Sequence, residues 1–287
     1  MRHNIDQISI CEQCMDIVIL YLCLGVIAGI VSGLFGLGGG VVIVPILIFT
    51  FSSQLFSAEV LTHMAVGTSL ATIMITSISS IAEHHKNSLV VWPVVLWLSP
   101  GICLGAIIGA IFAVSITGVL LQLFFGIFLC IVAFVMAKPA TSLFSVNMPG
   151  AYGKTIVGAI IGFFASIFGI GGGSLSVPYF SWTNMPMKNA IATSAACGLP
   201  IAISAAIVYS FKGLGNQELP EYTVGFVYLP AFFGIVTTSV FFAKVGAKLA
   251  YRLPSKALKA CFSLFLLAIG VYFIWTNILF VLMDYNG

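Results

Sequence analysis

Two glycine-rich segments carry the residue types and spacing in this chain that could do chemistry. Residues 36–40 and 169–173 both read Gly-x-Gly-Gly-Gly, each lies inside a long apolar run, and each is followed after four residues by a proline. Glycine inside a helix costs about 1 kcal/mol relative to alanine, so each motif predicts a break in a helix. A helix that begins directly after such a break presents free backbone N–H groups and the positive end of its dipole, an arrangement that binds anions.

The predicted substrate-binding groups are the backbone N–H groups at these two breaks and the hydroxyl groups near them. Thr68-Ser69 and Thr193-Ser194 occupy matching places in the apolar run that follows each break, with Gly67 before the first pair and Ala192 before the second. Neutral donors suit an anion that must bind weakly enough to leave again. The full predicted set is Gly38, Gly39, Gly40, Gly171, Gly172, Gly173, Ser174, Thr68, Ser69, Thr193 and Ser194.

Two simpler interpretations of these residues remain open at the level of sequence. The glycine triplets could be kinks that serve helix packing alone, and Ser or Thr hydroxyls inside membranes often bond to their own helix backbone. The small-residue ridges Gly25-x-x-x-Gly29-x-x-x-Gly33 and Gly158-x-x-x-Gly162 are expected to be helix-packing surfaces rather than ligand contacts.

Few ionisable residues accompany these motifs. His63 precedes Thr68 by about a turn and a half of helix, so it is a candidate to carry a proton coupled to anion movement, against the alternative of an interfacial histidine. No metal site, cofactor site or catalytic residue is predicted, and residues 83–86 are interpreted as a solvated turn. Neither glycine motif continues into the Gly-Lys-Ser/Thr of a phosphate loop.

The chain contains seven cysteines, of which only Cys11-x-x-Cys14 has a suggestive spacing. No second pair or nearby histidine completes a metal site. We expect these two cysteines to be surface thiols or to form a local disulfide. The alternative, from another functional class, is a membrane thiol-relay protein that uses this pair.

The two breaks belong to an internal repeat. Residues 24–47 and 157–180 align without a gap at ten positions, each of which has an identical partner 133 residues later. The matching residues of the first copy are Gly25, Ile27, Gly29, Phe35, Gly36, Gly38, Gly39, Gly40, Val44 and Pro45. Breaks at corresponding points of two halves are typical of the binding site of a transporter.

Composition assigns the chain to the membrane. It has 287 residues, of which 60% are hydrophobic and 7% are charged, whereas soluble domains carry about 25% charged residues. The apolar runs are long enough for membrane-spanning helices, and the net charge of +3 gives no indication of nucleic-acid binding. We therefore expect an all-α polytopic protein of the cell (inner or plasma) membrane, in contact with the lipid bilayer, and leave open whether it is a monomer or a homodimer.

The apolar segments divide the chain into two halves. They run over 17–35, 41–51, 61–82, 89–113 and 118–137, then over 155–170, 174–183, 190–211, 222–243 and 257–282. The predicted organisation is a polar tail (1–16), a first transmembrane repeat (17–137), a linker (138–154), a second repeat (155–282) and a short tail (283–287). The segments 41–51 and 174–183 are too short to cross a bilayer.

The distribution of charge predicts how these segments cross. If each glycine-broken element is a re-entrant hairpin, nine Lys and Arg residues share one side of the membrane and only Arg2 and Lys212 lie on the other. That bias is expected of a cytoplasmic side. It places both termini outside and makes the halves inverted repeats, each a broken element plus three transmembrane helices, with the breaks facing each other. The alternative is a broken element that crosses completely, which leaves the charges without bias.

At these repeats the sequence resembles the TauE/SafE family of sulfite and organosulfur anion exporters. The resemblance rests on GLFGLGGGVVIVPIL, on its second copy SIFGIGGGSLSVPYF, and on the paired elements that begin at Ala65 and Ala190. It implies a secondary transporter, not an enzyme, for a small sulfur-containing anion such as sulfite, sulfoacetate or a related organosulfonate. An anion channel with the same site is the nearest alternative.

Overall fold

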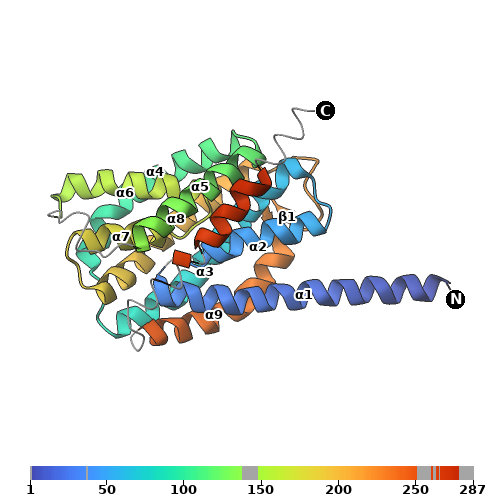
Figure 1. Cartoon of the computed structure of the whole chain (residues 1–287), viewed down its shortest axis with the longest axis horizontal. Helices are drawn as coiled ribbons and strands as arrows, with labels where there is room; N and C mark the ends of the chain where they lie inside the picture. The colour runs from blue at the N-terminus through green and yellow to red at the C-terminus, as the bar shows by residue number, and fades with distance from the viewer. Residues whose placement is uncertain are drawn as a thin grey trace.

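The computed structural model of the chain is a bundle of helices (Figure 1). It describes residues 2–36, 38–137, 148–250, 260, 263–264 and 266–277, apart from the side chains of residues 2–14 and 136. Its helices are α1 (Arg2–Phe35), α2 (Gly40–Ser53), α3 (Ala58–Lys86), α4 (Trp92–Val114), α5 (Gly118–Ala137), α6 (Ala151–Ile167), α7 (Gly173–Trp182), α8 (Met187–Lys212) and α9 (Leu229–Ala250). A further helix covers Leu266–Asn277.

Six of these helices are long and apolar enough to span a membrane: α1 from Met15 onward, α3, α4, α5 up to Val135, α8 and α9. Large apolar side chains also cover the outside of the bundle, among them Leu104, Ile108 and Phe134, which are each about 60% exposed. A soluble monomer rarely exposes so much contiguous apolar surface, so lipid is the natural solvent for this face. The chain is an all-α polytopic membrane protein, as its composition predicts.

Small residues allow the long helices to pack closely in pairs. Gly25, Gly29 and Gly33 place α1 directly against the backbone of α9, and the two helices run in the same direction. Gly158 and Gly162 place α6 against α4 in the same way. Both pairs are visible along the edges of the bundle in Figure 1. The interpretation of these glycine ridges as packing surfaces is confirmed.

Helices α3 and α8 form the centre of the bundle and run antiparallel. The end of α3 lies beside the beginning of α8, where the Asn189 amide donates to the Leu89 carbonyl oxygen at 3.0 Å. Near their midpoints, Ser77 and Gly198 approach each other. Most of α3 is buried, including its hydroxyl side chains, so it faces other helices on all sides.

Each short helix after a glycine motif runs back along the helix before it. Gly39, at the start of α2, lies against Ala28 of α1. At the other end of α2, the Gln54 amide donates to the Tyr21 hydroxyl at 3.0 Å. The chain therefore reverses between α1 and α2, and α2 returns toward the level at which the apolar part of α1 begins.

The second half departs from its predicted segments at residues 222–243. The apolar segment 222–243 was expected to be one helix, but Thr223–Val224 and Val227–Tyr228 pair as a two-stranded antiparallel hairpin and α9 continues to Ala250. The reason lies in the turn between the strands, where Gly225 adopts a φ of +56°. Valine, threonine and aromatic residues on either side favour strands over helix.

The charged side chains separate toward the two ends of the bundle. Lys86, Lys154, Lys188, Lys244 and Lys248 all lie where α3 and α9 end and where α6 and α8 begin. Asp16, Glu59, Glu218, Glu221 and Lys212 lie at the opposite end, where Ser57 donates to Glu218 at 2.5 Å. Among the described residues, Glu83 at the basic end and Lys212 at the acidic end are the exceptions. Arg2, Lys138, Arg252, Lys256 and Lys259, which also entered the charge argument, fall outside the side chains that the structure describes.

Candidate functional site: two glycine breaks in contact

The two glycine motifs, 133 residues apart in sequence, touch in the middle of the bundle. A Cβ atom on Gly38 would lie 3.0 Å from the Cα atom of Gly171, and a Cβ on Gly40 would collide with the Gly169 carbonyl oxygen. Ile73, half-way along α3, lies beside both Gly38 and Gly40. We call residues 36–40 the first break and residues 169–173 the second break.

Backbone conformation explains why these positions are glycine. The φ angles of Gly36, Gly38 and Gly39 are +65°, +70° and +79°, and those of Gly169 and Gly172 are +67° and +75°. Residues with a Cβ atom rarely adopt such angles. Gly39 and Gly172 are the N-cap residues of α2 and α7, so the same left-handed step starts both short helices.

Free backbone donors collect at the start of the short helices. The N–H groups of Gly40, Gly173 and Ser174 make no hydrogen bond to another residue that the structure describes. These are the first helical residues, whose N–H groups have no partner within a helix. Both α2 and α7 thus point free donors and the positive end of a dipole toward the contact between the breaks.

Ser174 adds an unused hydroxyl at the same place. Its side chain is 1% exposed, and its Oγ atom has no hydrogen-bond partner among the described residues. An unpaired buried hydroxyl costs about 1–3 kcal/mol in proteins. The corresponding residue of the first half, Val41, is fully buried and apolar. The chemistry of the two breaks therefore differs although their backbones agree.

The serines that follow the breaks bond across the molecule rather than into open space. Ser69 Oγ donates to the Gly169 carbonyl oxygen at 2.8 Å, and Ser194 Oγ donates to the Gly36 carbonyl oxygen at 3.4 Å. Each serine thereby holds the break of the other half, at equivalent glycines. Their hydroxyl protons are engaged with the protein in this conformation.

The two threonines cap the beginnings of other segments. Thr68 Oγ1 accepts from the Tyr228 N–H at 2.9 Å, just before α9, and Thr193 Oγ1 accepts from the Val91 N–H at 3.1 Å, just before α4. Like the two serines, they act in equivalent ways in the two halves. Their role as substrate ligands stays a prediction, and what the structure shows is that they position the helices around the breaks.

One polar residue of the second break was missed by sequence reasoning. Ser176 Oγ lies 2.9 Å from Ser194 Oγ and donates to the Gly172 carbonyl oxygen at 2.6 Å, with no exposed surface. Its counterpart in the first half is Ile43. The aligned repeats contained this signal, because both hydroxyls of α7's first turn replace aliphatic residues.

His63 lies apart from the breaks. Its Nδ1 atom is 3.2 Å from the Glu59 carbonyl oxygen, and its Nε2 atom is 3.1 Å from the carbonyl oxygens of Ala113 and Ile116. It therefore connects the start of α3 to the end of α4. About 15 Å of helix separates His63 from Ile73, which contacts the first break.

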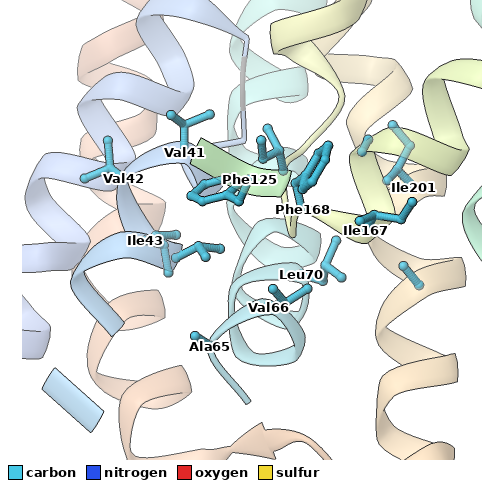
Figure 2. Close-up of a cluster of buried hydrophobic side chains, with 14 of the residues drawn as sticks. Val41, Val42, Ile43, Ala65, Val66, Leu70, Phe125, Ile167, Phe168 and Ile201 are labelled. Atoms are coloured by element: carbon cyan, nitrogen blue, oxygen red, sulfur yellow. The ribbon is translucent and has the colours of Figure 1, made fainter. Parts of the chain in front are cut away.

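An aromatic cluster borders the second break. Phe168, which directly precedes Gly169, stacks on Phe128 with ring centroids 4.5 Å apart and lies 5.8 Å from Phe125. Figure 2 shows Phe125 and Phe168 above Val66 of α3. These rings close the site on the side of α5.

Neither a metal site nor the thiol pair gains support. The described residues contain no group of three or more His, Cys, Asp or Glu side chains that could hold a metal ion. The side chains of Cys11 and Cys14 lie outside the described residues.

Comparison with known proteins agrees with the resemblance seen in the sequence. The family model described as sulfite exporter TauE/SafE matches residues 21–273. A probable membrane transporter protein of Haemophilus influenzae is 37% identical over 88% of this chain and 97% of its own length. Proteins with the same description from Methanocaldococcus jannaschii and Bacillus subtilis are each 30% identical, over 88% and 92% of this chain and 94% and 99% of their own lengths.

No solved structure matches the chain. The residues that the family model matches include both glycine breaks, α1 from Tyr21 onward and helices α2 to α9. The chain is therefore a membrane transporter rather than an enzyme, and it belongs to the sulfite exporter TauE/SafE family.

Proposed function

We propose that this protein is a secondary transporter of a small sulfur-containing anion, such as sulfite, sulfoacetate or a related organosulfonate, which binds between the two glycine breaks. The observation that carries the proposal is the buried Ser174 hydroxyl, unpartnered among the described residues, beside the free N–H groups of Gly173 and Ser174. Hydrogen bonds from such neutral donors to an oxyanion are charge-assisted and compensate for its lost water. The name of the matching family supports a sulfur oxyanion as the substrate.

In this proposal the backbone supplies the binding groups and the hydroxyls hold the backbone in place. The N–H groups around Gly38–Gly40 and Gly171–Gly173, with Ser174, contact the anion. Thr68, Ser69, Thr193 and Ser194 keep the two breaks and the adjoining helices in register through the hydrogen bonds described above.

The two repeats, 17–137 and 155–282, are proposed to be inverted relative to each other. Helix directions support this. The contacts of Thr68, Thr76 and Ser79 along α9 show that α3 and α9 run in the same direction, and α1 follows them. Helices α4, α6 and α8 run in the opposite direction. The equivalent helices of the two halves, α1 and α6, α3 and α8, α4 and α9, are therefore oriented oppositely, and the return of α2 along α1 supports a re-entrant element.

Both termini are proposed to lie on the non-cytoplasmic side of the membrane, which is the plasma membrane or the inner membrane. The cluster of five lysines at one end of the bundle supports a cytoplasmic location for that end under the positive-inside rule. A reporter fused after Gly287 should be active outside, and an exclusively cytoplasmic signal would contradict this orientation.

His63 is proposed as the residue that couples a proton to transport. Both of its ring nitrogens lie within hydrogen-bond distance of backbone carbonyl oxygens, at the start of α3 and the end of α4. Because His63 is distant from the breaks, coupling would act through movement of α3 against α4. Replacing His63 with Gln should reduce the response of flux to a proton gradient more than it reduces flux without one.

The test of the proposed function is flux of ³⁵S-labelled sulfite and labelled organosulfonates into proteoliposomes, with and without a proton gradient. We expect saturable uptake that an excess of unlabelled anion inhibits, and Ser174→Ala should lower it without loss of folded protein. Uptake that does not saturate would indicate a channel, and no uptake of any sulfur-containing anion would refute the proposal.

A further inference from the structure

A pocket with a few polar side chains in a mostly apolar lining lies at the acidic end of the bundle, away from the glycine breaks. It is a pocket of about 300 Å³ between α2, the start of α3, α5 and the helix Leu266–Asn277. This volume corresponds to about ten water molecules, which is ample for a small hydrated anion. Its polar lining residues are Ser52, Gln122, Tyr272, Thr276 and Asn277, all of them neutral.

Two of these polar side chains, Gln122 and Asn277, form a hydrogen-bonded chain that continues to Thr62 of α3. The Asn277 amide donates to Gln122 Oε1 at 3.2 Å, and the Gln122 amide donates to Thr62 Oγ1 at 2.7 Å. Each residue comes from a different helix, in surroundings that are otherwise apolar. A Gln amide has two N–H hydrogens, and Gln122 uses one of them among the described residues, so the other is available to a ligand.

The pocket continues toward the second break. A narrow cleft shares Ile48 and Gln122 with it and extends past Thr62 to Phe168, but the cleft has no room for a water molecule. At its inner end the cleft is lined by Val44 and Val66, and a Cβ atom on Gly169 would lie 2.9 Å from Val44 and 3.1 Å from Val66. The cleft thus leads from the pocket to the glycine break.

Aromatic rings close this passage. Phe125 and Phe168 both line the cleft, and Phe125 lies 5.6 Å from Phe273, which lines the pocket. Phe168 is the last residue before the left-handed Gly169, so its ring is attached to the backbone of the break itself. A change in the conformation of the second break would therefore move the ring.

We infer that this pocket is a second anion site on the route between the glycine breaks and the acidic end of the bundle, that the amides of Gln122 and Asn277 bind the anion there, and that Phe168 separates the two sites. The inference rests on the proposed function for the identity of the anion. It assigns to Phe168 a positioning role: the ring blocks the route in the conformation described here, and the route opens when the second break rearranges.

Cysteine accessibility tests the route without measuring transport. In a variant without native cysteines, Ser52→Cys in the pocket should react with a membrane-impermeant maleimide, whereas Val44→Cys, only 1% exposed, should react slowly. Adding Phe168→Ala should accelerate the reaction of Val44→Cys at least tenfold. The matched control is Val177→Cys, at the equivalent position of the second half and 3% exposed, which should stay slow.

Three labelling results would overturn the inference. The first is an unchanged labelling rate for Val44→Cys when Phe168→Ala is added. The second is an equal acceleration for Val177→Cys, which would mean that the substitution loosens the whole bundle. The third is labelling of Ser52→Cys only by a lipophilic maleimide, which would mean that lipid fills the pocket. If Phe168→Ala does not fold, Phe168→Leu, which keeps more of the packing, should still accelerate labelling of Val44→Cys, by several-fold.

Flux measurements separate this inference from the proposed function. Gln122→Leu should reduce sulfite flux about tenfold, while Gln54→Leu, which removes an amide at the same end of the bundle but outside the pocket, should keep flux near the parental value. Full flux in Gln122→Leu, or in Ser52→Cys after maleimide modification, would refute anion binding in the pocket. It would not affect the proposed site at the glycine breaks. No sulfite flux in the parent protein refutes the proposed function, and the labelling rates still decide whether Phe168 closes the route.

Discussion

The first and second glycine breaks share a backbone and differ in the side chains that follow it. Both contain left-handed glycines, both start a short returning helix, and both have a carbonyl oxygen held by a serine of the other half. Where the first break continues with Val41 and Ile43, the second continues with Ser174 and Ser176. The comparison teaches that the two halves keep the same backbone at the breaks but not the same polar side chains, so the hydroxyl of the proposed anion site belongs to the second half.

A substitution that pushes the first and second breaks apart should have the largest effect on folding. Gly40→Ala places a methyl group on the Gly169 carbonyl oxygen, so one of the backbones must move. We expect destabilisation by about 3 kcal/mol, which is severe overpacking, and a large loss of folded protein in size-exclusion chromatography. Gly150→Ala is the control, since nothing lies within 4 Å of the added methyl group. Normal yield of Gly40→Ala would contradict the close contact.

Substitutions at Ser174 and at its counterpart Val41, where the two breaks differ in polarity, should alter transport rather than folding. Ser174→Ala removes the unpartnered hydroxyl, and a hydrogen bond to a charged group is worth about 1.5–3 kcal/mol. The KM for anion flux should therefore rise about tenfold or more, with an unchanged melting temperature or a slightly higher one. The matched variant Val41→Ser, at the equivalent position, should not restore flux to Ser174→Ala. Restoration would mean that the two breaks are interchangeable.

The two N-cap glycines should differ in their tolerance of alanine. Both have a positive φ, which costs about 1–2 kcal/mol for a residue with a Cβ atom. At Gly39 the methyl group would also lie 2.7 Å from the Ala28 backbone carbonyl oxygen, whereas at Gly172 it would meet only the end of the flexible Ile201 side chain. Gly39→Ala should melt at a lower temperature than Gly172→Ala in detergent, and the reverse order would exclude this account.

The smallest expected effect concerns the two serines that hold the breaks. Ser69→Ala loses a hydrogen bond of 2.8 Å to Gly169, with a cost of about 1 kcal/mol. Ser194→Ala loses a longer bond of 3.4 Å to Gly36, together with its contact with Ser176. If the shorter bond is the stronger one, Ser69→Ala lowers the melting temperature more than Ser194→Ala does. Equal shifts would show that the Ser176 contact compensates.

The pocket beside Gln122 shows a different limit of sequence reasoning. Gln122 and Asn277 are 155 residues apart and belong to no recognisable motif. They meet because α5 and the helix Leu266–Asn277 run antiparallel, with Phe125 opposite Phe273. Only the packing of these two helices turns separate polar residues in apolar runs into one hydrogen-bonded chain.

The sequence by itself determined the class of the protein, the existence of two equivalent breaks and their position after apolar helices. These follow from local causes: 60% hydrophobic residues require lipid as solvent, and glycine triplets interrupt helices wherever they occur. It could not determine that residues 222–228 form a hairpin, because an apolar run of β-branched and aromatic residues is compatible with either helix or strand.

Only the tertiary structure decided which hydroxyl groups have hydrogen-bond partners within the protein. Thr68, Ser69, Thr193 and Ser194 have the residue types and spacing of a ligand shell. Each, however, bonds to a backbone group 100–160 residues away, and Ser194 also contacts Ser176. Ser174 looks no different in the sequence, yet its hydroxyl is buried without a described partner, as are those of Ser80 and Tyr179. A hydroxyl finds its partner through long-range packing, so residue type and spacing can nominate a site, but the fold selects its members.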